Sequence, residues 1–143
     1  MRLTRHTDNA LRCLTYLAVH TDRAVTSSEI ARRMGMSEDH LAKVVGRLAA
    51  LGYVDTQRGR AGGVRLARPA ADIRIGDVVR ETEDNLCLVE CFNPETNRCP
   101  IAPACGLAGA LDLALRAFMA VLDAVTLADL VREPRRLETL MPA

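Results

Sequence analysis

The chain has 143 residues, 49% of them hydrophobic, and a formal net charge of +1, so it can form the core of one ordinary domain and is not expected to be disordered. Two tyrosines, two phenylalanines and no tryptophan argue against a single-strand or RNA binder built on aromatic stacking. No apolar run reaches the roughly 18 residues of a membrane span, and the first residues lack the apolar stretch of a signal peptide. We therefore expect a cytoplasmic protein with no membrane partner.

The near-zero net charge hides an asymmetry along the chain. Residues 1–70 carry 12 basic and 6 acidic side chains, whereas residues 71–143 carry 7 basic and 12 acidic ones. A basic half joined to an acidic half indicates a polyanion-binding module coupled to a second unit. We therefore predict a DNA-binding domain over 1–70, followed over 71–143 by a cysteine-rich loop and a dimerisation helix.

Three helices are predicted in the first 50 residues. Each follows a polar residue that can cap its amino end, and the longer two have apolar residues at helical spacing. A glycine between the second and the third indicates that one helix ends in a tight turn before the next begins. The first predicted helix spans 7–20 and is capped by Thr7 or Asp8. The second is a short helix that begins at the capping box of Thr26 and ends near Met34, before Gly35. The third spans 38–50 and is capped by Ser37.

Two short strands, 53–57 and 64–67, are predicted on either side of a basic, glycine-rich segment. Two short helices followed by a basic hairpin are the order of elements in a winged helix-turn-helix. A generic three-helix core with a solvated hairpin is the alternative, but it leaves the three arginines and the paired glycines of the hairpin unexplained.

The winged helix-turn-helix interpretation names the DNA contacts. The second short helix enters the major groove with its amino-terminal residues foremost. Arginine suits contacts to phosphate and guanine, and glycine lets a hairpin tip lie close to DNA. The candidate DNA-binding residues are Ser28, Ser37, Asp39, His40 and Lys43 on the helices, and Arg58, Arg60, Gly62, Gly63 and Arg65 on the hairpin.

The second half is predicted to contain helices 75–83 and 104–124 around a loop at 84–105, with a last short helix behind Thr126 that ends before Pro134. The long helix carries few charges on any face. It can fold back on the first helix, but this composition fits a homodimer interface better, and we place the dimerisation unit at 104–131. The predicted fold class is mainly α with a small β-hairpin wing, a winged helix-turn-helix plus a long carboxy-terminal dimerisation helix.

Four of the five cysteines follow the pattern Cys87-x3-Cys91-x7-Cys99-x5-Cys105. In a reducing compartment, cysteines alone in a loop indicate soft-metal ligation. The spacing leaves open an iron–sulfur cluster, a structural zinc site, a thiol–disulfide switch and cysteines that are simply packed, although only one pair has the short spacing of a zinc knuckle. Cys13 is predicted to be a buried helix residue. No nucleophile–base pair or phosphate loop is present, so we do not expect an enzyme.

Several segments together resemble the iron–sulfur winged-helix regulator family, over nearly the whole chain. The wing glycines and the Ile-Gly-Asp run belong to the whole family, whereas the last cysteine run and the Leu-Ala-Asp-Leu tail are more particular to its nitric-oxide-sensing repressors. The segments are Leu3-Thr4, Thr7-Asp8, Leu11-Arg12, Arg58-Gly59-Arg60-Ala61-Gly62-Gly63-Val64-Arg65-Leu66, Ile73-Arg74-Ile75-Gly76-Asp77-Val78-Val79-Arg80-Glu81, Cys99-Pro100-Ile101-Ala102-Pro103-Ala104-Cys105 and Thr126-Leu127-Ala128-Asp129-Leu130.

The resemblance implies a homodimeric repressor that binds double-stranded promoter DNA and releases nitric-oxide-detoxification genes when its cluster is nitrosylated. It implies a 4Fe-4S cluster in preference to 2Fe-2S, with ligands Cys91, Cys99 and Cys105 and, from the partner subunit, Asp8, which Arg12 supports. Without the resemblance, Asp8 would be a helix cap.

Two departures from the family pattern remain, the long gap between Cys91 and Cys99 and the extra Cys87. The alternatives are a regulator of iron–sulfur or iron homeostasis, and a zinc or thiol-switch repressor. The members that regulate cluster assembly have a histidine soon after the last cysteine, and here Gly106-Leu107-Ala108-Gly109 stands there.

Overall fold

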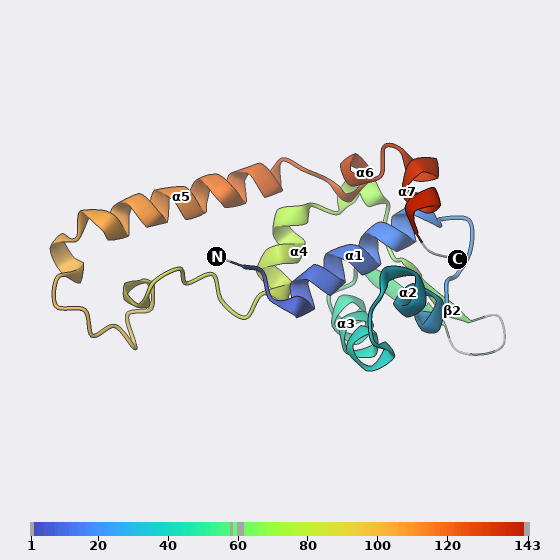
Figure 1. The fold of residues 1–143 in the computed structure, drawn as a ribbon, viewed down its shortest axis with the longest axis horizontal. Helices are drawn as coiled ribbons and strands as arrows, with labels where there is room; N and C mark the ends of the chain where they lie inside the picture. The colour runs from blue at the N-terminus through green and yellow to red at the C-terminus, as the bar shows by residue number, and fades with distance from the viewer. Residues whose placement is uncertain (1, 58, 60–61, 142–143) are drawn as a thin grey trace.

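Helix α1 (Arg5–Val19) is the centre around which the other elements pack. The computed structural model describes residues 2–57, 59 and 62–141. Helices α2, α3, α4 and α6, strand β2 and, more lightly, α7 all contact α1, whereas α5 extends away from this body as a long arm (Figure 1). The elements after α1 are α2 (Ser27–Met34), α3 (Glu38–Ala50), β1 (Val54–Gln57), β2 (Gly63–Leu66), α4 (Ile75–Thr82), α5 (Gly106–Asp123), α6 (Leu127–Leu130) and α7 (Pro134–Leu140), with single 3-10 turns at Ala70–Asp72, Glu90–Phe92 and Ala102–Ala104.

One hydrophobic core joins residues from both sides of residue 70. The apolar face of α1 packs against the inner faces of α2, α3 and α4, and α6 covers it from the other side. The largest fully buried side chains are Tyr16, Leu14, Leu17, Ile30, Leu41, Leu48, Ile73, Leu127, Val25, Val44, Val54 and Val78.

The prediction that Thr7 or Asp8 caps the first helix is wrong. The helix begins at Arg5, and the Thr4 hydroxyl accepts the backbone N–H of Thr7 at 3.2 Å. Thr4 is itself held by Glu83, whose carboxylate accepts the Thr4 backbone N–H at 2.6 Å. Because Glu83 lies 79 positions away in the chain, no local pattern could have indicated this start.

The capping box predicted at Thr26 is only half formed. The Thr26 hydroxyl accepts the backbone N–H of Glu29 at 3.2 Å. The Glu29 carboxylate, however, turns to Arg23 and accepts the hydroxyl of Tyr16 at 2.8 Å. The prediction that Ser37 caps the third helix is confirmed, since its hydroxyl accepts the backbone N–H of His40 at 3.3 Å.

The hairpin is antiparallel and leans on a third segment. Val54 pairs with Leu66, and Gln57 with Gly63. The backbone of Val64 then exchanges two hydrogen bonds with Val25, at 2.7 and 2.9 Å. A Cβ on Gly63 would lie 2.8 Å from the Val25 carbonyl oxygen, so the fold itself requires this glycine.

The predicted unit 104–131 is not one continuous helix. Helix α5 ends at Asp123, and Thr126 then opens α6 with a complete capping box, in which its hydroxyl accepts the Asp129 N–H and the Asp129 carboxylate accepts its N–H. Leu127 is fully buried in the core of the body. Helix α7 follows with Pro134 in its first turn and was not predicted. Among the described residues, no helix has the length and hydropathy of a membrane span.

Candidate nucleic-acid interface and cysteine loop

Helices α2 and α3 form a helix-turn-helix. Gly35 is left-handed (φ 63°, ψ 41°), and the Met36 N–H closes the turn on the Ala31 carbonyl at 2.8 Å. A glycine adopts this conformation without steric cost, so the chain can reverse between the two helices. One face of α3 is buried against the body, and the opposite face, including the predicted residues Ser37, Asp39, His40 and Lys43, is exposed.

The start of α3 is locally ordered before any DNA is bound. The Ser37 hydroxyl and the His40 Nδ1 are 2.7 Å apart. Asp39 and Lys43 are exposed on the same helix, and Ser28 is exposed on α2 with its hydroxyl 3.3 Å from that of Thr26. These side chains are therefore accessible to a duplex.

The predicted wing contacts are only partly described. Arg58 and Arg60 lie outside the described residues. Arg65 is exposed on β2, next to the half-buried Gly62 and Gly63. Arg68, which sequence reasoning did not single out, lies over the ring of Tyr53 with its guanidinium carbon 4.4 Å from the ring centroid. It also donates to the carbonyls of Leu51 and Gly52 at the base of the hairpin.

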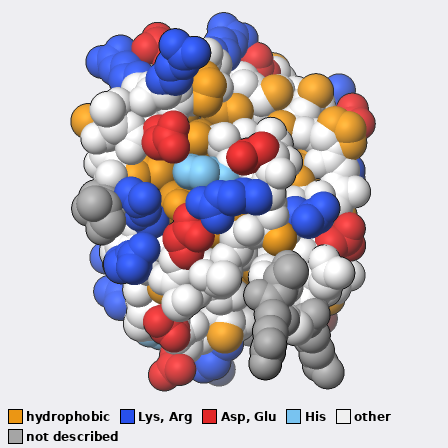
Figure 2. Space-filling model, turned by 90° about the vertical axis from the view of Figure 1, so that its right-hand side faces the viewer, with side chains coloured by type: hydrophobic (Ala, Val, Ile, Leu, Met, Phe, Trp, Pro, Cys, Tyr) orange, Lys and Arg blue, Asp and Glu red, His pale blue; other side chains and the backbone are white. Residues whose placement is uncertain are grey.

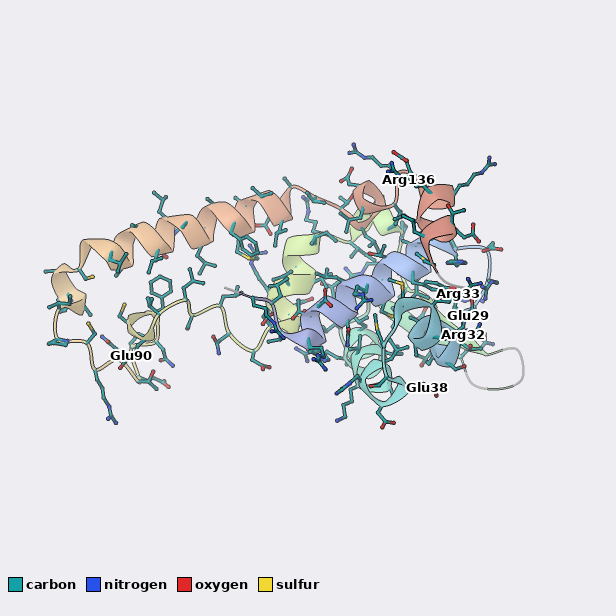
Figure 3. All side chains as sticks on the ribbon, viewed as in Figure 1. Glu29, Arg32, Arg33, Glu38, Glu90 and Arg136 are labelled. Atoms are coloured by element: carbon teal, nitrogen blue, oxygen red, sulfur yellow. The ribbon has the colours of Figure 1, made fainter. Side chains whose placement is uncertain are left out.

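On the face at the right of Figure 1, basic and acidic side chains alternate around a histidine (Figure 2). At this end of the molecule, Arg23 forms an ion pair with Glu29 at 2.5 Å, and the His20 Nε2 lies 3.8 Å from the Glu138 carboxylate. Figure 3 places Glu29, Arg32 and Arg33 together on α2, with Arg136 on α7 above them. Because charges of both signs alternate there, this face is not a one-sign surface for a polyanion.

The four loop cysteines are reduced thiols on one irregular segment. Cys91, Cys99 and Cys105 are half-buried, and Cys87 is exposed. Cys91 lies in the turn Glu90–Phe92, and Cys105 is the residue that precedes α5. Cys13 is buried on α1, as predicted, and burial raises the pKa of its thiol to about 12. A thiol in this state is not a candidate nucleophile or ligand.

Polar side chains shape the cysteine loop from within. The Asn97 side chain accepts the Cys99 backbone N–H at 2.9 Å, and Asn85 accepts that of Cys87 at 3.2 Å. The Glu90 carboxylate accepts the Arg98 N–H at 2.8 Å. Glu90 precedes Cys91, and Arg98 precedes Cys99, so this bond joins the two segments that carry these cysteines. Sequence reasoning missed Glu90, since the contact spans eight positions of irregular chain.

The donor chemistry of this loop fits an iron–sulfur cluster. Thiolates are the ligands that such clusters use, and three half-accessible thiols lie on one loop. Among the described residues, no three His, Cys, Asp or Glu side chains are gathered as a metal ion would require. The described part of one subunit therefore contains no preformed ligand set for a metal centre of either kind, cluster or zinc.

Asp8 lies in the first turn of α1, close to the recognition helix, and it also lines a surface pocket with Arg2, Leu3 and Arg5. Arg12 is 3.6 Å from its carboxylate, one turn along α1, as predicted. The same guanidinium donates to the carbonyl of Met34, the last residue of α2. A surface pocket continues this connection, and its lining is Arg5, Asp8, Asn9 and Arg12 of α1 with Gly35, Met36, Ser37 and His40.

A helix-turn-helix, a two-stranded wing and an exposed recognition face define a DNA-binding transcriptional regulator of the winged-helix class. A model of the Rrf2 family, described as iron-dependent transcriptional regulators, matches residues 3–133. The chain belongs to the Rrf2 family.

The relatives agree with this assignment over the full chain. The chain is 49% identical to the HTH-type transcriptional regulator NsrR of Geobacillus kaustophilus over 142 residues, covering 99% of this chain and 97% of that protein. It is 46% identical to NsrR of Bacillus subtilis with the same coverage.

Two solved structures share the fold. T. potens IscR has a TM-score of 0.76 at 26% identity and covers 100% of this chain and 93% of its own. CymR, the global cysteine regulator of B. subtilis, has a TM-score of 0.74 at 27% identity, with 91% and 95% covered.

Proposed function

We propose that this chain is a homodimeric repressor that holds an iron–sulfur cluster and leaves its promoter when nitric oxide reaches that cluster. The observation that carries the proposal is the set Cys91, Cys99 and Cys105, half-buried on one loop, in a chain that aligns with NsrR over almost its full length. The genes it releases would be those for nitric-oxide detoxification.

The three cysteines and Asp8 of the partner subunit would hold the cluster, 4Fe-4S in preference to 2Fe-2S. When bound, the cluster supplies iron with which nitric oxide reacts. The chain's own residues set how readily that happens. Cys91 and Cys99 are brought together by the bond between Glu90 and Arg98. A carboxylate is a harder and weaker ligand for such iron than a thiolate, so Asp8 would be easier to displace than the three cysteines.

The exposed face of α5 supports the homodimer. Large apolar side chains that are about two-thirds exposed are unusual on a monomer when they share one element. Leu107 is 66%, Leu113 69% and Val121 65% exposed, and the only buried residue of this 18-residue helix is Met119. A second copy would cover this face in a symmetric pair and present two recognition helices to two half-sites.

Arg12 connects Asp8 to the helix-turn-helix. Its guanidinium binds the Asp8 carboxylate and the Met34 carbonyl, and Met34 ends the helix just before the turn to α3. If Asp8 becomes a ligand, the charge that faces Arg12 is shared with the metal. The hydrogen bond from Arg12 to the Met34 carbonyl would then change, and the position of α3 would change with it. A differential affinity of a few kcal/mol changes DNA binding by orders of magnitude.

The test begins with iron, sulfide and zinc content of protein purified without oxygen, since air can remove such a cluster. Nitric oxide is then titrated into the loaded protein bound to promoter DNA. We expect matched iron and sulfide, and DNA release as nitric oxide is added. Zinc without sulfide, or DNA affinity that nitric oxide leaves unchanged, would contradict the proposal.

A second candidate is a regulator of iron–sulfur or iron homeostasis, favoured by the fold shared with IscR. Such a protein would hold the same cluster but respond to iron supply. DNA release on iron chelation, together with indifference to nitric oxide in the same assay, would support this candidate.

A further inference from the structure

Helix α5 is attached to the DNA-binding body at its carboxy-terminal end. Its second half contributes Leu115, Phe118, Met119 and Leu122 to the edge of the core, mainly against α4, whereas the first half, 106–114, adds nothing to that core. An 18-residue helix is about 27 Å long. The arm is therefore supported at one end, and its angle is set there.

Directional polar contacts concentrate at this end. The Arg80 guanidinium of α4 donates two hydrogen bonds to the Asp123 carboxylate, each at 2.6 Å. Arg74 donates to the Asp123 carbonyl at 2.8 Å. Backbone bonds from Ile75 N–H to the Val125 carbonyl at 3.0 Å, and from Leu127 N–H to the Ile73 carbonyl at 2.8 Å, continue the connection.

Gly76 lets the Asp123 carboxylate lie directly on the first turn of α4. A Cβ built on Gly76 would be 1.9 Å from the Asp123 Oδ1 and 3.0 Å from its backbone nitrogen. A carboxylate is favoured at the amino end of a helix, where backbone N–H groups are unpaired. Hydrogen bonding to Arg80 lowers the pKa of Asp123, so the carboxylate stays charged at neutral pH.

We propose that Gly76, Arg80 and Asp123 form a joint that sets the angle between α5 and the DNA-binding body, and through it the half-site spacing that the dimer selects. The inference rests on the proposed dimer on α5. Apolar packing tolerates sliding, whereas a two-bonded arginine–carboxylate pair has one geometry. These three are positioning residues and need not touch DNA.

The length of α5 makes a small rotation at the joint measurable. A rotation of about 10° at one end of a rod about 27 Å long moves the other end by about 5 Å. Adjacent base pairs are about 3.4 Å apart along the duplex. A loosened joint therefore changes the match to an operator by more than one base pair without altering the recognition helix.

The experiment compares spacing preference. A duplex inverted repeat is selected from a random-sequence library by the loaded wild-type protein, then resynthesised with its spacer changed by one and two base pairs in each direction. Asp123→Ala removes the ion pair with Arg80. Arg80 still has Asp77 3.5 Å away, so it keeps an acidic partner. The matched control is Asp112→Ala, which removes a 2.8 Å pair with Arg116 inside α5 itself.

We expect wild type and Asp112→Ala to lose about tenfold in affinity per base pair of altered spacing, the size typical of one mismatched contact. Asp123→Ala should remain dimeric in sedimentation and lose less than about threefold on the altered spacings. An unchanged one-base-pair preference in dimeric Asp123→Ala would overturn the joint. A wild type that shows no spacing preference would instead contradict the proposed dimer.

The variant Gly76→Ala disturbs the same joint from its α4 side. Its methyl group would collide with Asp123, so alone it should shift the preferred spacing. Combined with Asp123→Ala it should have a smaller effect than alone, because the carboxylate is gone and only the 3.0 Å approach to the backbone nitrogen remains. Additive effects would overturn the joint. If Asp123→Ala does not fold, Arg80→Gln removes the same contact, and its spacing preference decides the question in the same way.

Discussion

At the scale of single residues, two glycines have opposite roles. Gly63 lies against the backbone of Val25, which cannot move aside, whereas nothing lies within 4 Å of the position where Gly46 would carry a Cβ. Gly46 is in the middle of α3, where glycine costs backbone entropy relative to alanine. Only the three-dimensional neighbourhood separates a required glycine from a replaceable one.

We expect Gly63→Ala to lower the free energy of unfolding by about 1–3 kcal/mol, because the new methyl group overpacks a backbone contact. Gly46→Ala should raise it by about 0.5–1 kcal/mol through helix propensity. Urea denaturation of both variants measures the two changes. Equal changes in the free energy of unfolding would show that the Gly63 position has no steric conflict with Val25.

Glu29 is a carboxylate whose ionisation stabilises the body. Its carboxylate accepts hydrogen bonds from Arg23 and Tyr16, and the bond to Arg23 contributes most to lowering its pKa to about 2. The folded pKa lies below the unfolded value of 4.5. The stabilisation is therefore complete above the unfolded value and is lost as the pH falls toward 2.

The prediction is that Glu29→Gln lowers the free energy of unfolding by about 1 kcal/mol at pH 7 and by less at pH 3. Chemical denaturation at the two pH values tests it. Glu133→Gln serves as the control, because its pair with Arg136 is solvent-exposed and 3.4 Å long. A loss that is the same at both pH values would argue against a role for the charge.

At the scale of elements, α1 connects the proposed ligand to the recognition helix. Asp8 and Arg12 lie one turn apart on α1, and Arg12 reaches the carbonyl that ends α2. Eight of the 15 residues of α1 are buried, and the helix packs against both α2 and α3. In the proposed mechanism, a change at its first turn would therefore act on the helix-turn-helix.

We expect Asp8→Ala to alter the rate at which the loaded protein loses its visible absorbance in the presence of nitric oxide, because the fourth ligand is gone. Asp22→Ala, also exposed but in the turn after α1, should leave that rate unchanged. Identical decay curves for Asp8→Ala and wild type would remove Asp8 from the ligand set.

At the scale of the whole molecule, the body and the arm differ in what stabilises them. The body has a continuous core, whereas the first half of α5 and the cysteine loop have exposed apolar side chains and internal polar turns. In the proposed dimer, a second subunit would bury the exposed leucines of this arm.

Leu113→Glu should raise the Kd of the dimer by at least about tenfold and shift the protein toward monomer, because a charge would be buried without a partner. Sedimentation velocity over a concentration series measures the change. Leu140→Glu is the control, since Leu140 is equally exposed but lies on α7. A dimer that survives Leu113→Glu would place the interface elsewhere.

The sequence by itself determined the class of the fold and the regulator family. Local signals were sufficient for α2, α3, the hairpin, α4 and α5, because caps, left-handed glycines and apolar periodicity act within a few residues of chain. The similarity of long segments pointed to the same family that the Rrf2 match shows, whereas the cysteine spacing by itself left several kinds of site open.

Only the tertiary structure decided the features that depend on distant residues. The start of α1 depends on Glu83, the Gly63 position on Val25, and the α5 angle on Gly76 and Arg80. Helix α7 packs on α1 through a contact between His20 and Glu138 that no local pattern indicates. Each of these contacts joins residues more than 30 positions apart, and a sequence pattern does not record such proximity because the free energy of a contact depends on distance in space.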